Sequence, residues 1–98
     1  MQQAFGLIRG QDGTIISGSG NFTVSKAGAG IYNVTVQGSF TQLPVVVVSP
    51  GSNYYMTSNV LFTYEDFAGS YDKFRVETGF TDQRNRMDGD FCFMAVWP

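Results

Sequence analysis

The feature that most constrains the fold of this chain is a period-two alternation of apolar and polar side chains in short runs. Residues 31–37 show it most clearly, because Tyr32, Val34 and Val36 alternate with polar side chains. Such alternation is typical of a β-strand with one face on a core and the other in water, and no run has the spacing of an amphipathic helix. On this basis strands are predicted at 3–9, 14–17, 21–25, 31–37, 43–49, 60–64, 73–78 and 91–97.

Turn residues separate these runs. Asp12-Gly13 is a strong hairpin signal between two apolar runs, and the chain has 12 Gly but only 3 Pro. A chain of 98 residues has room for one core. The sequence therefore predicts one all-β domain over residues 1–98, an antiparallel β-sandwich or jelly-roll-like barrel of about six to eight short strands.

Two of the predicted strands lack alternation. Val45–Val48 and Phe91–Trp97 are apolar at both parities, and charged residues make up only 14% of the chain, against about 25% in typical soluble domains. Leaving such side chains in water forgoes roughly 1.5–3 kcal/mol each, so we expect another subunit to cover the second face. The alternative cover is the chain's own loops, 49–59 or 64–72. The residues expected at the subunit interface are Val46, Val48, Cys92, Met94 and Val96.

Charge and hydropathy argue against several partners. Six basic residues without a dense run, and a net charge of −2, do not suit a nucleic-acid binder. No stretch approaches the ~20 apolar residues that cross a bilayer, so no membrane insertion is expected. The first residues do not resemble a signal peptide. A single cysteine, Cys92, allows no disulfide within the chain. These residues leave the localisation open.

The residue types also argue against an enzyme. The chain has no histidine, which removes the Ser-His-Asp and Cys-His systems and the commonest zinc ligand. Glu65 and Asp66 are adjacent and would point to opposite sides of a strand, while Glu77 is expected to pair with Arg75. We expect no catalytic residue and no cofactor.

A calcium site is a weak alternative. Asp88-Gly89-Asp90 begins like a calcium-binding loop, with Asp82 nearby, but Phe91 follows where a further oxygen ligand is needed. The default interpretation is a turn entering the last strand, and no metal is expected.

Two polar loops are the candidate binding sites. Residues 52–59 place tyrosines among small polar side chains, which suits recognition of sugars or proteins, and residues 81–88 gather guanidinium, amide and carboxylate groups. The candidate ligand-binding residues are Tyr54, Tyr55, Arg84, Asn85, Arg86 and Asp88. The alternative for both loops is a solvated connection with packed tyrosines.

Three sets of segments carry a family resemblance: 9–24; 30–36 with Phe40 and 44–48; and 74–76 with 90–96. Together they resemble a small β-sandwich module of phage tail-fibre tips and bacterial collagen-like proteins. The second half is distantly similar to H-type lectins, six-stranded sandwiches that form trimers and bind N-acetylgalactosamine-type sugars between subunits. Thr78-Gly79-Phe80 stands where those lectins have an aromatic-His pair, and 59–62 stands where they have an arginine. The resemblance therefore implies a fold, a trimer and surface display rather than a particular sugar.

The expected function is that of a non-catalytic recognition module, a homotrimeric fibre-tip-like head for a glycan or another cell-surface ligand. It would act on a virion or an extracellular surface. The alternative is a structural assembly module, such as a trimer cap, a virion decoration or a filament subunit, with no small-molecule ligand. A third interpretation, a complement-like or tumour-necrosis-factor-like signalling head, normally needs a longer chain.

Overall fold

The computed structural model describes residues 2–51, 56–61, 71–80 and 86–98. This part of the chain forms eight β-strands and contains no helix, which confirms the all-β prediction. The strands are β1 (Gln2–Ile8), β2 (Ile15–Gly18), β3 (Phe22–Gly28), β4 (Ile31–Val36), β5 (Val45–Pro50), β6 (Met56–Leu61), β7 (Lys73–Phe80) and β8 (Phe91–Trp97).

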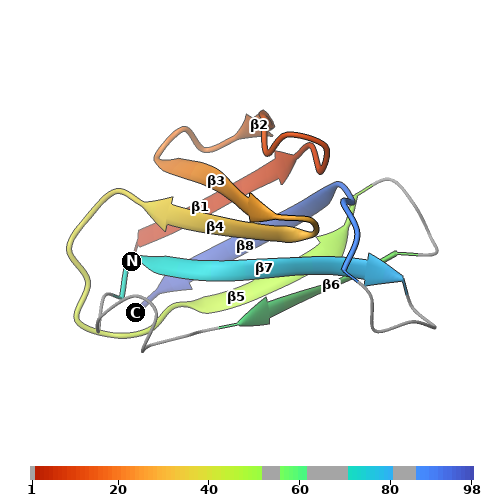
Figure 1. The fold of residues 1–98 in the computed structure, drawn as a ribbon. Coiled ribbons are helices and arrows are strands. Elements are labelled where there is room, and N and C mark those ends of the chain that lie inside the picture. The colour runs from red at the N-terminus through yellow and green to blue at the C-terminus, as the bar shows by residue number, and fades with distance from the viewer. Residues whose placement is uncertain (1, 52–55, 62–70, 81–85) are drawn as a thin grey trace.

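The strands form two four-stranded antiparallel sheets that pack face to face (Figure 1). Sheet A has the order β2-β1-β8-β5, and sheet B has the order β3-β4-β7-β6. The predicted antiparallel sandwich is therefore confirmed. Strand β6 begins at Met56, earlier than the predicted 60–64, and pairs with β7 from Met56 opposite Phe80 to Leu61 opposite Arg75.

The core lies between the two sheets. Its buried hydrophobic residues are Ala4, Ile8, Phe22, Tyr32, Val34, Val36, Phe74, Val76, Phe91, Phe93, Ala95 and Trp97. Each large side chain of this set contributes roughly 1.5–3 kcal/mol of hydrophobic free energy. In β4 the prediction that Tyr32, Val34 and Val36 share the core face is confirmed. In β8 the side chains that face the core are Phe91, Phe93, Ala95 and Trp97.

Strand β1 shows why one residue on its inner face is a glycine. Gly6 lies between the core residues Ala4 and Ile8, and a Cβ atom at Gly6 would stand 2.4 Å from the Phe22 ring. That ring packs edge-on against Phe93 of the opposite sheet, with centroids 4.9 Å apart. The side chains of Phe5 and Leu7 therefore lie on the opposite, outer face of β1.

The predicted hairpin between β1 and β2 is present. Gly13 has a φ of +76°, a left-handed conformation that favours glycine. The Arg9 N–H donates to the Thr14 carbonyl oxygen at 2.8 Å, and the Asp12 side chain accepts the Thr14 N–H at 3.0 Å. The hairpin returns β2 to the edge of sheet A, where Ile15 and Ile16 are 41% and 48% exposed.

Candidate interaction face

The charged residues are distributed unevenly between the two sheets. The four strands of sheet A contain none of the chain's Lys, Arg, Asp or Glu residues. The strands of sheet B carry Lys26, Lys73, Arg75 and Glu77, and Arg75 donates from Nε to Oδ1 of its cross-strand neighbour Asn33 at 3.1 Å. Of the two sheets, only sheet B therefore carries charged residues in its strands, and Lys73, Arg75 and Glu77 alternate with the core residues Phe74 and Val76.

The outer face of sheet A, which we call the A face, is organised in rows across its strands. Each outward residue of β8 lies between one partner on β1 and one on β5. The three rows are Gln3–Val96–Val45, Phe5–Met94–Val47 and Leu7–Cys92–Ser49. The central row consists entirely of large apolar side chains.

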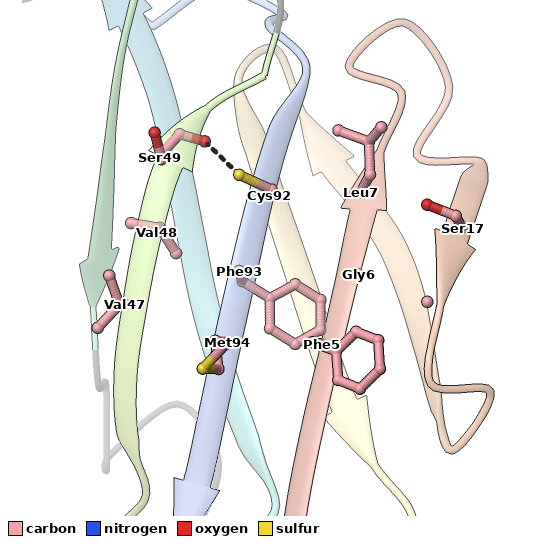
Figure 2. A pocket seen from close by; sticks show the side chains of 11 residues that line it. Phe5, Gly6, Leu7, Ser17, Val47, Val48, Ser49, Cys92, Phe93 and Met94 are labelled. Carbon is pink, nitrogen blue, oxygen red and sulfur yellow. Dashed lines mark hydrogen bonds between the residues drawn. The ribbon is translucent and has the colours of Figure 1, made fainter.

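These apolar side chains are open to solvent. Val45 is 68% exposed, Val47 65%, Met94 55% and Phe5 45%. A shallow groove of about 580 Å³ runs over the A face, and Figure 2 shows Phe5, Met94 and Val47 around it on three neighbouring strands. A contiguous exposed apolar surface of this kind is characteristic of an interaction site.

Cys92 lies in this groove. It is half-buried and unoxidised, and its thiol donates to the carbonyl oxygen of Ser49 at 3.6 Å (Figure 2). A cysteine held in this way acts as a small apolar side chain of the face.

The five residues expected at a subunit interface fall into two groups. Cys92, Met94 and Val96 belong to the A face. Val46 and Val48 pack against the core instead, and the outward valines are Val45 and Val47. Because both parities of this strand are valine, only its pairing with β8 determines which pair faces outward.

The candidate ligand-binding residues that are described form contacts within the chain. Arg86 Nη2 lies 2.6 Å from Glu77 Oε1. The Asp88 carboxylate accepts from Lys26 Nζ at 2.6 Å and from the Gly30 N–H at 2.9 Å. Tyr54, Tyr55, Arg84 and Asn85 lie outside the described residues.

Asp88 thus secures the turn between β3 and β4. Lys26, and then the Gly30 N–H, hold the pKa of Asp88 below its ordinary value. The Lys26 ammonium also donates to the carbonyl oxygen of Gln11 at 3.1 Å, which ties the first hairpin to the same cluster. Sequence analysis missed this role because Lys26 and Asp88 are 62 residues apart.

The weak calcium alternative finds no support among these aspartates. Asp90 Oδ1 accepts the Gly10 N–H at 2.7 Å, so Asp88 and Asp90 both serve backbone N–H groups. Asp82 lies outside the described residues. In the part of the chain that the structure describes, no three His, Cys, Asp or Glu side chains are grouped so that they could hold a metal ion. Glu77 pairs with Arg86, whereas Arg75 was the partner expected from the sequence.

Comparison with known protein families, curated proteins and solved structures gives no significant match to this chain. Among the described residues, no helix is long and apolar enough to span a membrane.

Proposed function

We propose that this chain is a non-catalytic module that assembles with further copies of itself through the A face. The observation that carries the proposal is the contrast between the two outer faces: sheet A has no charged residue in its strands and exposes Phe5, Val47 and Met94. Covering these side chains recovers part of the roughly 1.5–3 kcal/mol that each forgoes in water.

A second copy is the occupant that suits this face best. Every copy carries the same apolar rows, so copies of the chain can shield one another's A faces without a partner of another kind. The absence of charge matters here, because like charges on a self-pairing face would repel one another across the contact. The chain's net charge of −2 arises from residues outside the strands of sheet A.

The dimensions of the A face fit a small protein interface. The strands β2, β1, β8 and β5 have four, seven, seven and six residues. At about 3.3 Å per residue and about 4.8 Å between strands, they give a projection on the order of 400 Å². Side chains standing out of the sheet add accessible area, and a standard interface buries about 800 Å² per partner. We favour three copies, because the resemblance to fibre-tip modules implies a trimer.

Absence of catalysis is part of the proposal and rests on the residue types. The sequence contains no histidine. The described carboxylates are engaged with cations or backbone N–H groups of the same chain, namely Asp12, Asp72, Glu77, Asp88 and Asp90. Display on a virion or an extracellular surface would follow from the resemblance.

Recognition of a surface ligand is the second candidate function. Arg86 and Asp88 already have partners within the chain, so these two residues do not favour it. A polar hollow at one end of the sandwich does favour it, because its lining has hydrogen-bonding groups and two aromatic rings.

The test is the mass of the particle in solution, measured by native mass spectrometry and sedimentation. The unaltered chain is expected to form oligomers, and Met94→Lys, which puts a charge in the central row, is expected to give monomers. Thr23→Lys is the matched control, because Thr23 is an exposed residue of β3 in sheet B. A monomeric unaltered chain at about millimolar concentration would refute the proposal, as would a Met94→Lys oligomer as stable as that of the control.

A further inference from the structure

A second concavity lies at the end of the sandwich where Gln2 pairs with Trp97. It has a volume of about 290 Å³ and shares no residue with the groove on the A face. The connection from β4 to β5, residues 37–44, forms one of its walls. Its lining combines two amides, two hydroxyls, two aromatic rings and a proline, namely Gln2, Gln42, Ser39, Thr41, Phe40, Trp97 and Pro98.

The aromatic part of the hollow is held rigidly. Phe40 stacks on Trp97 with ring centroids 4.2 Å apart and planes 19° apart. Trp97 is buried and donates its indole N–H to the carbonyl oxygen of Tyr71 at 2.8 Å, so its position is fixed. Phe40 is only half-buried, so it is the ring that a ligand in the hollow can contact.

A glycine makes this arrangement sterically accessible. Gly38 has a φ of +139°, a conformation that other residues rarely adopt. A Cβ atom there would stand 2.8 Å from the Phe40 ring and 3.3 Å from the Gln2 side-chain nitrogen. The local sequence therefore lets the ring and the amide approach the same point of the backbone.

The polar groups of the hollow are available for a ligand. The Gln2 amide donates one N–H to the carbonyl oxygen of Gln37 at 3.3 Å, which leaves its oxygen as an acceptor. Ser39, Thr41 and Gln42 are exposed or at the surface and make no side-chain hydrogen bond to another described residue. Hydroxyls and amides both donate and accept, so together they match a ligand that does the same.

We propose that this hollow binds a neutral sugar residue, with the apolar face of the sugar on Phe40 and its hydroxyls on Gln2, Thr41 and Gln42. Among the described residues, no charged side chain lines the hollow, so no side chain there offers a counter-charge to an ionic ligand. An apolar ligand would leave amides without partners, at a cost of about 1–3 kcal/mol per group. The volume of about 290 Å³ lies just below the range of ligand sites, which starts at about 300 Å³, and so suits one monosaccharide unit.

Binding at this hollow does not depend on assembly through the A face. Gln2 and Trp97 lie at the end of β1 and β8, away from the Phe5–Met94–Val47 row. Sugar binding by the monomeric Met94→Lys variant would be expected to equal that of the unaltered chain, and the two proposals therefore succeed or fail separately.

The test is a titration of the isotope-labelled chain with methyl glycosides of glucose, galactose, mannose and N-acetylglucosamine, followed by amide NMR shifts. Saturable shifts are expected at 39–42 and at the Trp97 indole. Gln42→Ala and Thr41→Ala are each expected to weaken binding about threefold to tenfold. Gln37→Ala is the matched control, because Gln37 is exposed and contributes only its backbone oxygen. No saturable shift with any of the four glycosides, or equal affinity of Gln42→Ala and Gln37→Ala, would overturn the proposal.

Discussion

The hydroxyl group of Tyr32 donates a 2.6 Å hydrogen bond to the carbonyl oxygen of Gly10, across the gap between β4 and the loop that follows β1. Both residues are buried, so this bond joins the two halves of the sandwich away from water. The Tyr32 ring also packs against Phe91, with centroids 5.1 Å apart.

Tyr32→Phe tests the bond without disturbing the ring. The variant leaves a buried carbonyl oxygen without its partner, so the free energy of unfolding is expected to fall by about 1–3 kcal/mol. Urea unfolding at a fixed protein concentration measures the change, because assembly would otherwise shift the midpoint. A variant as stable as the unaltered chain would show that water replaces the hydroxyl at Gly10.

Asp88→Asn tests the contribution of the Lys26–Asp88 ion pair. The folded-state pKa of Asp88 lies below the ordinary value of 3.8, so the carboxylate stabilises the fold above that pH. This stabilisation is lost as the pH falls through the folded pKa. Because the pair is partly exposed, with Lys26 26% and Asp88 36% accessible, its contribution is expected not to exceed about 1 kcal/mol.

The measurement is the free energy of unfolding of both proteins between pH 7 and pH 2. The unaltered chain should be the more stable at pH 7, and the difference should shrink below about pH 4. Other acids with a lowered pKa, such as Asp12, titrate equally in both proteins and cancel in the difference. A difference that stays constant down to pH 2 would contradict the assignment.

Gly30 is expected to tolerate substitution far less well than Gly20. Both have left-handed backbones, with φ of +69° and +82°. A Cβ atom at Gly30 would lie 2.6 Å from the Thr78 carbonyl oxygen and 2.8 Å from the Met87 nitrogen, whereas Gly20 has nothing within 4 Å.

Gly20→Ala should therefore show only the backbone cost of about 1–2 kcal/mol. Gly30→Ala adds steric strain and should lose about 2–5 kcal/mol in total. Thermal and urea unfolding of the two variants give the comparison. Equal losses would mean that the backbone at Gly30 moves aside at little cost.

The valines of β5 should differ in how much they stabilise the fold, depending on whether they face the core or the solvent. Val46→Ala removes methyl groups that pack on the core and is expected to cost about 1 kcal/mol of unfolding free energy. Val45→Ala acts at a 68% exposed position and should change the stability by less than about 0.5 kcal/mol. The comparison is made with monomeric Met94→Lys as the background, so that assembly does not contribute. The reverse order of the two losses would place β5 in the other register.

The alternating strands could be predicted from the sequence because the alternation itself indicates which side chains face the core. In β4 the apolar residues Tyr32, Val34 and Val36 had to face the core, and they do. The Asp12-Gly13 hairpin could also be predicted, since the conformation of a tight turn depends on the residues within it.

What depends on distant partners could not be predicted. Val45–Val48 is apolar at both parities, and only the pairing of Val47 with Met94 and of Val45 with Val96 determines which valines are outside. Asp88 has the composition of a ligand-binding loop residue, but Lys26 and Gly30 reach it from a hairpin far back in the chain. The hollow beside Phe40 likewise joins the first and last strands to a connection between them.

The uneven distribution of charge between the two sheets has a thermodynamic consequence. Association through a face whose strands carry no Lys, Arg, Asp or Glu should depend little on ionic strength, since there is no Coulomb interaction between charged side chains for salt to screen. It should also show a negative change in heat capacity, the usual mark of apolar burial. Warming from refrigerator to room temperature should then strengthen the contact, so that cold, rather than salt, is the condition that takes the particle apart.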